Sequence, residues 1–294
     1  MVALLQLVQA QFQLLWPYWL AGVVLGALLK VGGIEQALTR ILAGRAEEKS
    51  VGIMIGMGAI GGAVSPFCLY GAMPVLGSLQ RSGVPEAAIA AFLVASPLIN
   101  PNLFVFSLVL GWPLALIRLM TAIVAGTVAG HLVYANWFGP VGFRFGDRCS
   151  EAVTSSFSEF VKELVDSAWF SGRFFLLGMV LAAAVDLWVT KTFLMGLLGD
   201  SNPVAILAGA FLGIPLYACG GGTIPLLREL LLLGVDPGVV VAFMLAGPAT
   251  KISNLTAIGA VSGARWLSRY TIFALSGAIM TGYIVHLVWM VWPH

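Results

Sequence analysis

The chain has 294 residues, of which 60% are hydrophobic and only 10% are charged, with a formal net charge of +2. Soluble domains carry about 25% charged residues, so this composition excludes an ordinary soluble protein and predicts a multi-pass membrane protein. The small net charge argues against a nucleic-acid partner, and we expect the lipid bilayer and a small solute or ion as partners.

The sequence predicts two halves joined by a polar segment. We assign residues 1–140 to a first transmembrane repeat, 141–160 to a linker and 161–294 to a second repeat. Apolar residues at helical spacing between Glu151 and Asp166 predict an amphipathic helix on the membrane surface. Each repeat is expected to contain an opening span and two closing spans, at 14–29, 87–110 and 115–134 in the first and at 169–187, 238–261 and 271–290 in the second.

Residues 65–102 and 216–253 carry the same motif twice. The first copy contains SPFCLYGAMP and ASPLINPN, and the second contains LYACGGGTIP and AGPATKIS. An offset of 151 residues, without a gap, pairs Cys68 with Cys219 and Pro74 with Pro225. Because the chain holds only 3 Cys and 14 Pro, these coincidences indicate a duplication. A duplicated apolar segment broken at matching Gly and Pro positions is typical of a transporter's binding site.

The topology of each motif has two interpretations. An apolar stretch that is short for a span, 51–64 or 204–212, comes first, and a short helix at 73–81 or 224–233 follows it. The whole segment is either one long broken span or a re-entrant hairpin that returns to the side it entered from.

The distribution of Lys and Arg favours the hairpin. The broken-span topology divides the loop cations 8 to 6 between the two sides, whereas the hairpin topology divides them 11 to 3. In the hairpin topology the side with fewer cations holds Arg118, Lys191 and Arg228. Lys251 lies within the membrane in both topologies. Since Lys and Arg collect in cytoplasmic loops, we predict an all-α protein with six spans, two re-entrant hairpins and inverted repeats. The linker is then cytoplasmic, and both termini lie outside.

The Gly and Pro residues of the motif predict breaks in the helices. Proline removes a helical donor and glycine permits tight turns, so these positions expose backbone groups to a central cavity. The alternative is a set of kinked helices that only pack against one another. The expected breaks lie at Pro66, Gly71, Pro74, Pro97, Gly221, Gly222, Pro225 and Pro248.

Several side chains near these breaks are candidates for binding the solute. Cys68 and Cys219 occupy equivalent positions and are candidate ligands for a soft metal or metalloid, although a membrane Cys is often only a small apolar filler. Lys251 is the one basic residue in a central apolar segment, where it either attracts an anion or caps carbonyls. Polar ligands are expected from Tyr70, Ser96, Asn100, Asn102, Thr223, Thr250 and Asn254, which would otherwise hold helices together.

The paired motifs resemble those of the ArsP-like predicted permease family, over nearly the whole chain. That resemblance implies a bacterial or archaeal inner-membrane permease, with some relatives exporting trivalent organoarsenicals and others suspected of moving soft metals. Many relatives carry a Cys-x-Cys pair in the first motif, whereas Leu69 and Tyr70 follow Cys68 here. The two motifs therefore supply two thiols, Cys68 and Cys219, instead of three.

We expect a secondary permease that exports a small, soft, thiol-reactive solute by alternating access. The first alternative is a carrier or channel for a small anion that uses Lys251. A second is an intramembrane enzyme with Cys68 or Cys219 as nucleophile, which we disfavour because neither has a His or a carboxylate nearby in sequence. No nucleotide-binding loop and no cofactor motif is present in the sequence, and a homo-oligomer is compatible with it.

Overall fold

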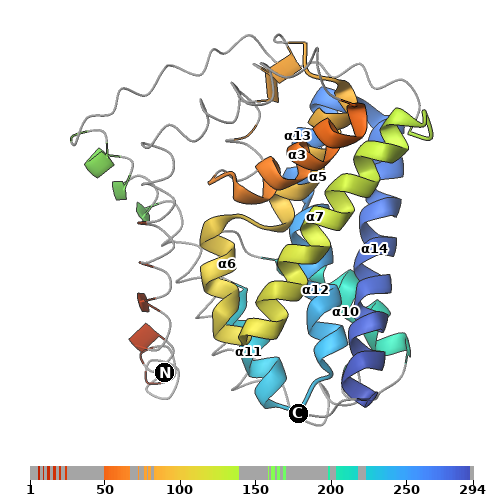
Figure 1. The fold of residues 1–294 in the computed structure, drawn as a ribbon. Coiled ribbons are helices and arrows are strands. Elements are labelled where there is room, and N and C mark those ends of the chain that lie inside the picture. Colours follow the sequence, from red (N-terminus) through yellow and green to blue (C-terminus); the bar gives the residue numbers. More distant parts are fainter. Residues whose placement is uncertain are drawn as a thin grey trace.

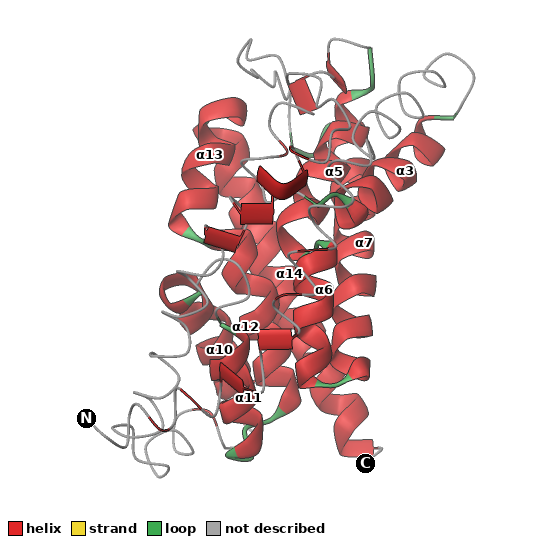
Figure 2. Cartoon of the chain, turned by 90° about the vertical axis from the view of Figure 1, so that its left-hand side faces the viewer, coloured by secondary structure: helices red, strands yellow, loops and turns green. Residues whose placement is uncertain are grey.

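The computed structural model describes residues 50–66, 83–138, 203–217 and 223–291, together with isolated positions elsewhere. Every regular element in these residues is helical, and Figures 1 and 2 show no strand among them. In chain order the elements are α3 (Val51–Val64), α5 (Glu86–Leu98), α6 (Pro101–Ser107), the 3-10 turn η1 (Leu108–Leu110), α7 (Trp112–Tyr134), α10 (Pro203–Leu216), α11 (Ile224–Leu232), α12 (Pro237–Thr250), α13 (Ile252–Ser262) and α14 (Ala264–Val291).

Three stretches among the described residues are long and apolar enough to cross a membrane. They are Glu86–Leu110, Trp112–Tyr134 and Ala264–Val291, with 25, 23 and 28 residues. At a rise of about 1.5 Å per residue each exceeds the roughly 30 Å of a bilayer core. These lengths confirm the expectation of a membrane protein, and the residues that the structure describes are all-α. The opening spans expected at 14–29 and 169–187 fall almost wholly outside the described residues.

The 151-residue offset found in the sequence also relates the helices. α12 begins at Pro237, 151 residues after Glu86, and α13 begins at Ile252, 151 residues after Pro101. In the first half α5 packs against both α3 and α7, and in the second α12 packs against both α10 and α14. The two halves therefore share one helix arrangement.

Equivalent glycines bring the helices of each half into close contact. A Cβ added to Gly62 of α3 would lie 2.6 Å from the carbonyl oxygen of Phe92 in α5. A Cβ on Gly213 of α10 would lie 2.8 Å from the carbonyl oxygen of Phe243 in α12. Both pairs are related by the 151-residue offset. Small residues at such crossings are how membrane helices approach closely, so the duplication preserved a packing geometry as well as a motif.

The central helices α5 and α12 are enclosed by the others. All residues of α5 except Glu86 are buried, and so are all residues of α12 except Pro237. α7 and α14 lie on one side of them and run in opposite directions, as Figure 1 shows by their colours. α7 rises in that view from its start beside α6, whereas α14 descends toward the C-terminus.

Some boundaries differ from those expected from the sequence. α10 continues to Leu216 instead of ending at 212, because its apolar residues extend without a break through Pro215. Arg118 was counted among the cations on one side of the membrane, but it lies in α7 and is completely buried. Without Arg118 the predicted loop cations divide 11 to 2 for the hairpin topology and 7 to 6 for the broken span.

Candidate solute site at the helix breaks

The first half has a break between α5 and α6. α5 continues through Pro97 and ends at Leu98, after which Ile99 and Asn100 are extended, with φ near −149° and −148°. Pro101 explains this geometry, since it lacks an N–H and favours an extended residue before it. The side chain of Asn100 then caps α6 by accepting a 2.8 Å hydrogen bond from the N–H of Leu103.

The second half has a break at the equivalent position. α12 continues through Pro248 and ends at Thr250, and Lys251, with φ −52° and ψ 136°, separates it from α13. The Asn254 amide donates a 2.6 Å hydrogen bond to the carbonyl oxygen of Pro248. Thr250 uses its hydroxyl within its own helix, 2.6 Å from the carbonyl oxygen of Ala246. Asn100 and Lys251, paired by the offset, therefore both occupy the residue immediately before the second helix segment.

The first break lies halfway along its span. Leu98 is the 13th of the 25 residues in Glu86–Leu110, or about 18 Å along the axis from Glu86. A break here leaves backbone carbonyls without their usual N–H donors in buried, apolar surroundings. Other groups must satisfy them.

Arg118 satisfies the freed carbonyl of Leu98. Its Nε donates to that oxygen at 2.9 Å, its Nη1 donates to the hydroxyl of Ser107 at 3.1 Å, and its Nη2 donates to the hydroxyl of Tyr217 at 3.1 Å. The Ser107 hydroxyl donates in turn to the carbonyl oxygen of Leu103 at 2.7 Å. The guanidinium thus joins α7 to the first break and, through Tyr217, to the second half.

Sequence reasoning missed this residue, although a signal was present. Arg118 is the only Asp, Glu, Lys or Arg between Glu86 and Arg144. Gly111 and Pro113 mark the start of a helix, and Pro113 lies in the first turn of α7. Arg118 follows Pro113 by five residues, more than one helical turn inside α7, and so could have been placed within the membrane.

The second half satisfies the equivalent carbonyl with a neutral group. Ala249 is related to Leu98 by the 151-residue offset, and its carbonyl oxygen accepts a 3.0 Å hydrogen bond from the hydroxyl of Tyr270 in α14. Tyr270 is fully buried and stacks on Trp266 with ring centroids 5.6 Å apart. Each break is therefore capped by a side chain from the long helix that follows it.

The remaining candidates are placed unevenly. Ser96 Oγ and Asn102 Oδ1 are buried and have no hydrogen-bond partner among the described residues. Thr223 is buried at the start of α11, with Pro225 in its first turn, and Pro66 lies two residues beyond the end of α3. The other candidates fall outside the described residues, namely Cys68, Tyr70, Gly71, Pro74, Cys219, Gly221 and Gly222. A site formed by these residues remains a prediction.

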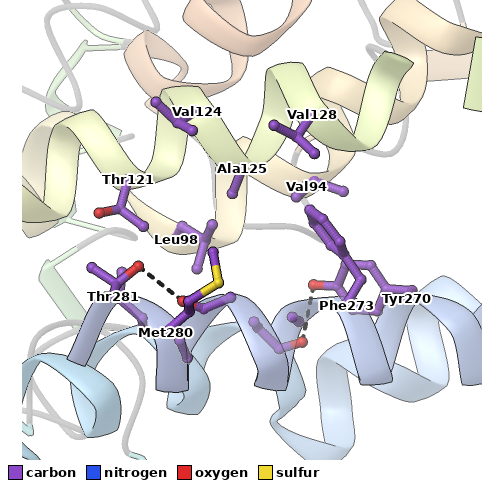
Figure 3. A pocket seen from close by; sticks show the side chains of 15 residues that line it. Val94, Leu98, Thr121, Val124, Ala125, Val128, Tyr270, Phe273, Met280 and Thr281 are labelled. Carbon is purple, nitrogen blue, oxygen red and sulfur yellow. Dashed lines mark hydrogen bonds between the residues drawn. The ribbon is translucent and has the colours of Figure 1, made fainter. Parts of the chain in front are cut away.

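A cavity of about 140 Å³ lies between α7 and α14 (Figure 3). Its lining includes Val94 and Leu245, which the offset pairs, so the cavity lies between the two halves. The walls are almost entirely apolar, and the hydroxyls of Tyr270 and Thr281 are bonded to backbone carbonyls. None of the residues that line this cavity is charged. In the described part of the chain no three His, Cys, Asp or Glu side chains lie close enough to hold a metal.

Apolar helices interrupted at equivalent positions of a duplicated segment are typical of membrane transport proteins. The chain belongs to the ArsP-like family described as predicted permease, which it matches over residues 2–287. It is therefore a membrane permease by family, in agreement with its apolar helices.

Relatives from distant organisms match most of the chain. One from Streptococcus mutans serotype c, named as a candidate subunit of a two-component membrane permease complex, is 28% identical and covers 79% of each chain. UPF0718 protein YraQ of Escherichia coli K12 is 25% identical over 92% of this chain and 78% of its own. UPF0718 protein MJ0584 of Methanocaldococcus jannaschii is 20% identical over 90% of this chain and 91% of its own. No solved structure gives a significant match.

Proposed function

We propose that the protein is a secondary permease that moves a small solute by alternating access at a central site, where the breaks of two inverted repeats meet. The observation that carries this proposal is the pair of equivalent interruptions at Asn100 and Lys251 in the most buried helices. Interrupted helices in inverted halves allow one half to move against the other around a fixed site. The antiparallel course of α7 and α14 supports the inverted relation.

The solute in the first instance is a soft, thiol-reactive species such as a trivalent organoarsenical, exported across the inner membrane. This assignment depends on Cys68 and Cys219, which thiol chemistry would use to hold such a solute. The alternative solute is a small anion bound with the help of Lys251, which lies at the second break. Association with a second subunit or a second copy is part of the proposal, because one relative is named as a complex subunit.

Expression in a bacterial strain that lacks arsenic exporters tests the thiol assignment. The wild-type chain should raise resistance to trivalent methylarsenical, and Cys68→Ser or Cys219→Ser should abolish the gain. Cys149→Ser is the matched control, because that residue belongs to the predicted linker and should leave resistance unchanged. Resistance retained in both test variants would contradict the thiol mechanism.

Uptake into proteoliposomes tests the alternative. Lys251→Met should abolish uptake of a small anion if Lys251 supplies the attraction, whereas its counterpart variant Asn100→Ala should retain the charge-dependent part of uptake. Equal uptake by wild type and Lys251→Met would remove Lys251 from the solute site.

A further inference from the structure

We infer that Arg118 is the centre of an oxyanion-binding site between the two halves, which favours the alternative solute of the proposed permease, a small anion, over the thiol-reactive one. This inference rests on the proposed function and names the class of its solute. Arg118, Tyr217 and the first break form the site, and none of the expectations drawn from the sequence included Arg118 as a ligand.

The charge of Arg118 is the first observation. A guanidinium stays protonated in proteins, and this one is completely buried, six residues into the span Trp112–Tyr134 and bonded to the carbonyl of Leu98. Its partners among the described residues are a carbonyl and two hydroxyls, all neutral. A buried charge is costly unless a counter-charge compensates it, so this position favours a bound anion.

The unused donors are the second observation. A guanidinium has five N–H groups, and three of them are used, which leaves one on Nη1 and one on Nη2. The hydroxyl of Tyr217 accepts from Arg118, and its own proton has no acceptor among the described residues. The Ser107 hydroxyl cannot add a donor, since its proton goes to the Leu103 carbonyl. Three donors thus remain around one positive charge, which suits the several acceptor oxygens of an oxyanion.

The comparison between the halves is the third observation. The carbonyl of Ala249, equivalent to that of Leu98, is satisfied by the neutral hydroxyl of Tyr270. Capping the broken helix therefore does not require a charge. The charge at Arg118 must then have another role, and binding an anionic solute is the role that its buried, donor-rich setting supports.

The position of Tyr217 links this site to both halves. Its ring lies against Gly247 of α12, where an added Cβ would clash with it, and its hydroxyl reaches Arg118 of α7. Tyr217 also comes two residues before Cys219 in the duplicated motif. An oxyanion held by Arg118 and Tyr217 would contact both halves at once, as alternating access requires of a central solute.

Thermal unfolding of the purified full chain in detergent tests the site. Sodium sulfate, sulfite, phosphate and nitrate are titrated separately, against sodium chloride at equal ionic strength. At ~100 times its dissociation constant, an anion that binds only the folded state should raise the midpoint by roughly 5 °C. We expect this shift from at least one of the four oxyanions with wild type, its loss in Arg118→Gln and its reduction in Tyr217→Phe.

Arg269→Gln is the matched control. Arg269 is related to Arg118 by the 151-residue offset, but it is exposed and donates to the carbonyl oxygen of Trp137 at 3.2 Å. Arg269→Gln removes the same charge as Arg118→Gln, so general electrostatic effects are equal in the two variants. The anion-dependent shift of the unfolding midpoint should remain in Arg269→Gln. Should Arg118→Gln fail to fold, Tyr217→Phe decides, because it leaves the guanidinium in place.

The outcomes separate this inference from the proposed function. The binding site is overturned when none of the four oxyanions shifts the wild-type unfolding midpoint. It is also overturned when the shift is unchanged in Arg118→Gln or, if Arg118→Gln does not fold, in Tyr217→Phe. Methylarsenical resistance that survives Arg118→Gln would keep the permease and overturn the oxyanion as its solute. An Arg118-dependent shift without flux of that anion into proteoliposomes would keep the binding site and overturn the transport function.

Discussion

The hydroxyl of Tyr217 accepts a 3.1 Å hydrogen bond from Nη2 of Arg118, although the two residues are 99 positions apart. Arg118 belongs to α7 in the first half, and Tyr217 follows α10 in the second. This bond is a direct polar connection between the halves. It forms beside the carbonyl that the first helix break exposes, so the connection and the break share one residue.

Replacing Tyr217 by Phe should destabilise the protein. The substitution removes one hydroxyl and leaves a buried N–H of Arg118 without that acceptor, which costs about 1–3 kcal/mol. Thermal unfolding in detergent, without added oxyanion, should show a lower midpoint. Tyr134→Phe is the control, since Tyr134 is 66% exposed at the end of α7. Equal midpoints for the two variants would argue against a contribution from the Arg118–Tyr217 bond.

Adding a methyl group to the close helix contacts should also destabilise the fold. A Cβ on Gly58 would collide with the backbone carbonyl of Ala88, and a Cβ on Gly209 would lie 2.9 Å from that of Val239. Gly58→Ala and Gly209→Ala should each cost about 1–3 kcal/mol, as overpacking does. Gly56→Ala is the matched control in α3, where nothing lies within 4 Å of the added carbon.

These glycine variants are measured by thermal unfolding and by the monodisperse fraction after purification. Gly56→Ala should match or slightly exceed wild type, because alanine is the better helix former. If Gly58→Ala and Gly209→Ala had the same unfolding midpoint and monodisperse fraction as Gly56→Ala, close helix packing at these two equivalent glycines would be refuted.

Asp236 should have two separable roles at the start of α12. Its Oδ1 accepts a 2.7 Å hydrogen bond from the N–H of Gly238, and its Oδ2 lies 2.7 Å from Nδ1 of His286 in α14. Asp236→Asn keeps a capping oxygen and removes the charge, whereas Asp236→Ala removes both. We expect the Ala variant to be less stable than the Asn variant by about 1 kcal/mol.

A thermodynamic cycle with His286→Ala tests the second role of Asp236. If the two side chains interact, the double variant Asp236→Ala/His286→Ala should lose less stability than the sum of the single variants. Strict additivity of the three unfolding free energies would mean that the contact between Asp236 and His286 contributes nothing.

The hairpin topology predicts which side of the membrane Ser82 faces. With a re-entrant hairpin, a Cys placed at Ser82 lies on the cytoplasmic side together with the linker, as the 11 to 3 charge division suggests. A membrane-impermeant thiol reagent should then modify Ser82→Cys in inside-out vesicles but not in intact cells or spheroplasts. Modification from the outer side alone would establish the broken-span topology instead.

The sequence by itself determined the class of the protein and the position of its repeats. The length of its uncharged apolar stretches required membrane helices. The rare Cys and Pro residues gave an offset of 151 residues between the two halves, and the starts of α5 and α12 and of α6 and α13 show the same offset. The first break also has a local cause, because Pro101 constrains its own backbone and that of Asn100, although the sequence placed the expected break at Pro97, which lies inside α5. These features depend on composition and on residues that are adjacent in the chain, and both can be read from the sequence.

Only the tertiary structure decided what surrounds the breaks. Whether Arg118 lies in a loop or inside the protein depended on where α7 begins and on how it packs against α5, and its partner Tyr217 comes from 99 residues away. Tyr270 also depends on tertiary packing. Its hydrogen bond to the carbonyl of Ala249 is equivalent to the bond from Arg118 to the carbonyl of Leu98, although the 151-residue offset pairs Arg118 with the residue before Tyr270. Hydrogen bonds to freed carbonyls are set by distance in space, and the order of residues along the chain does not specify that distance.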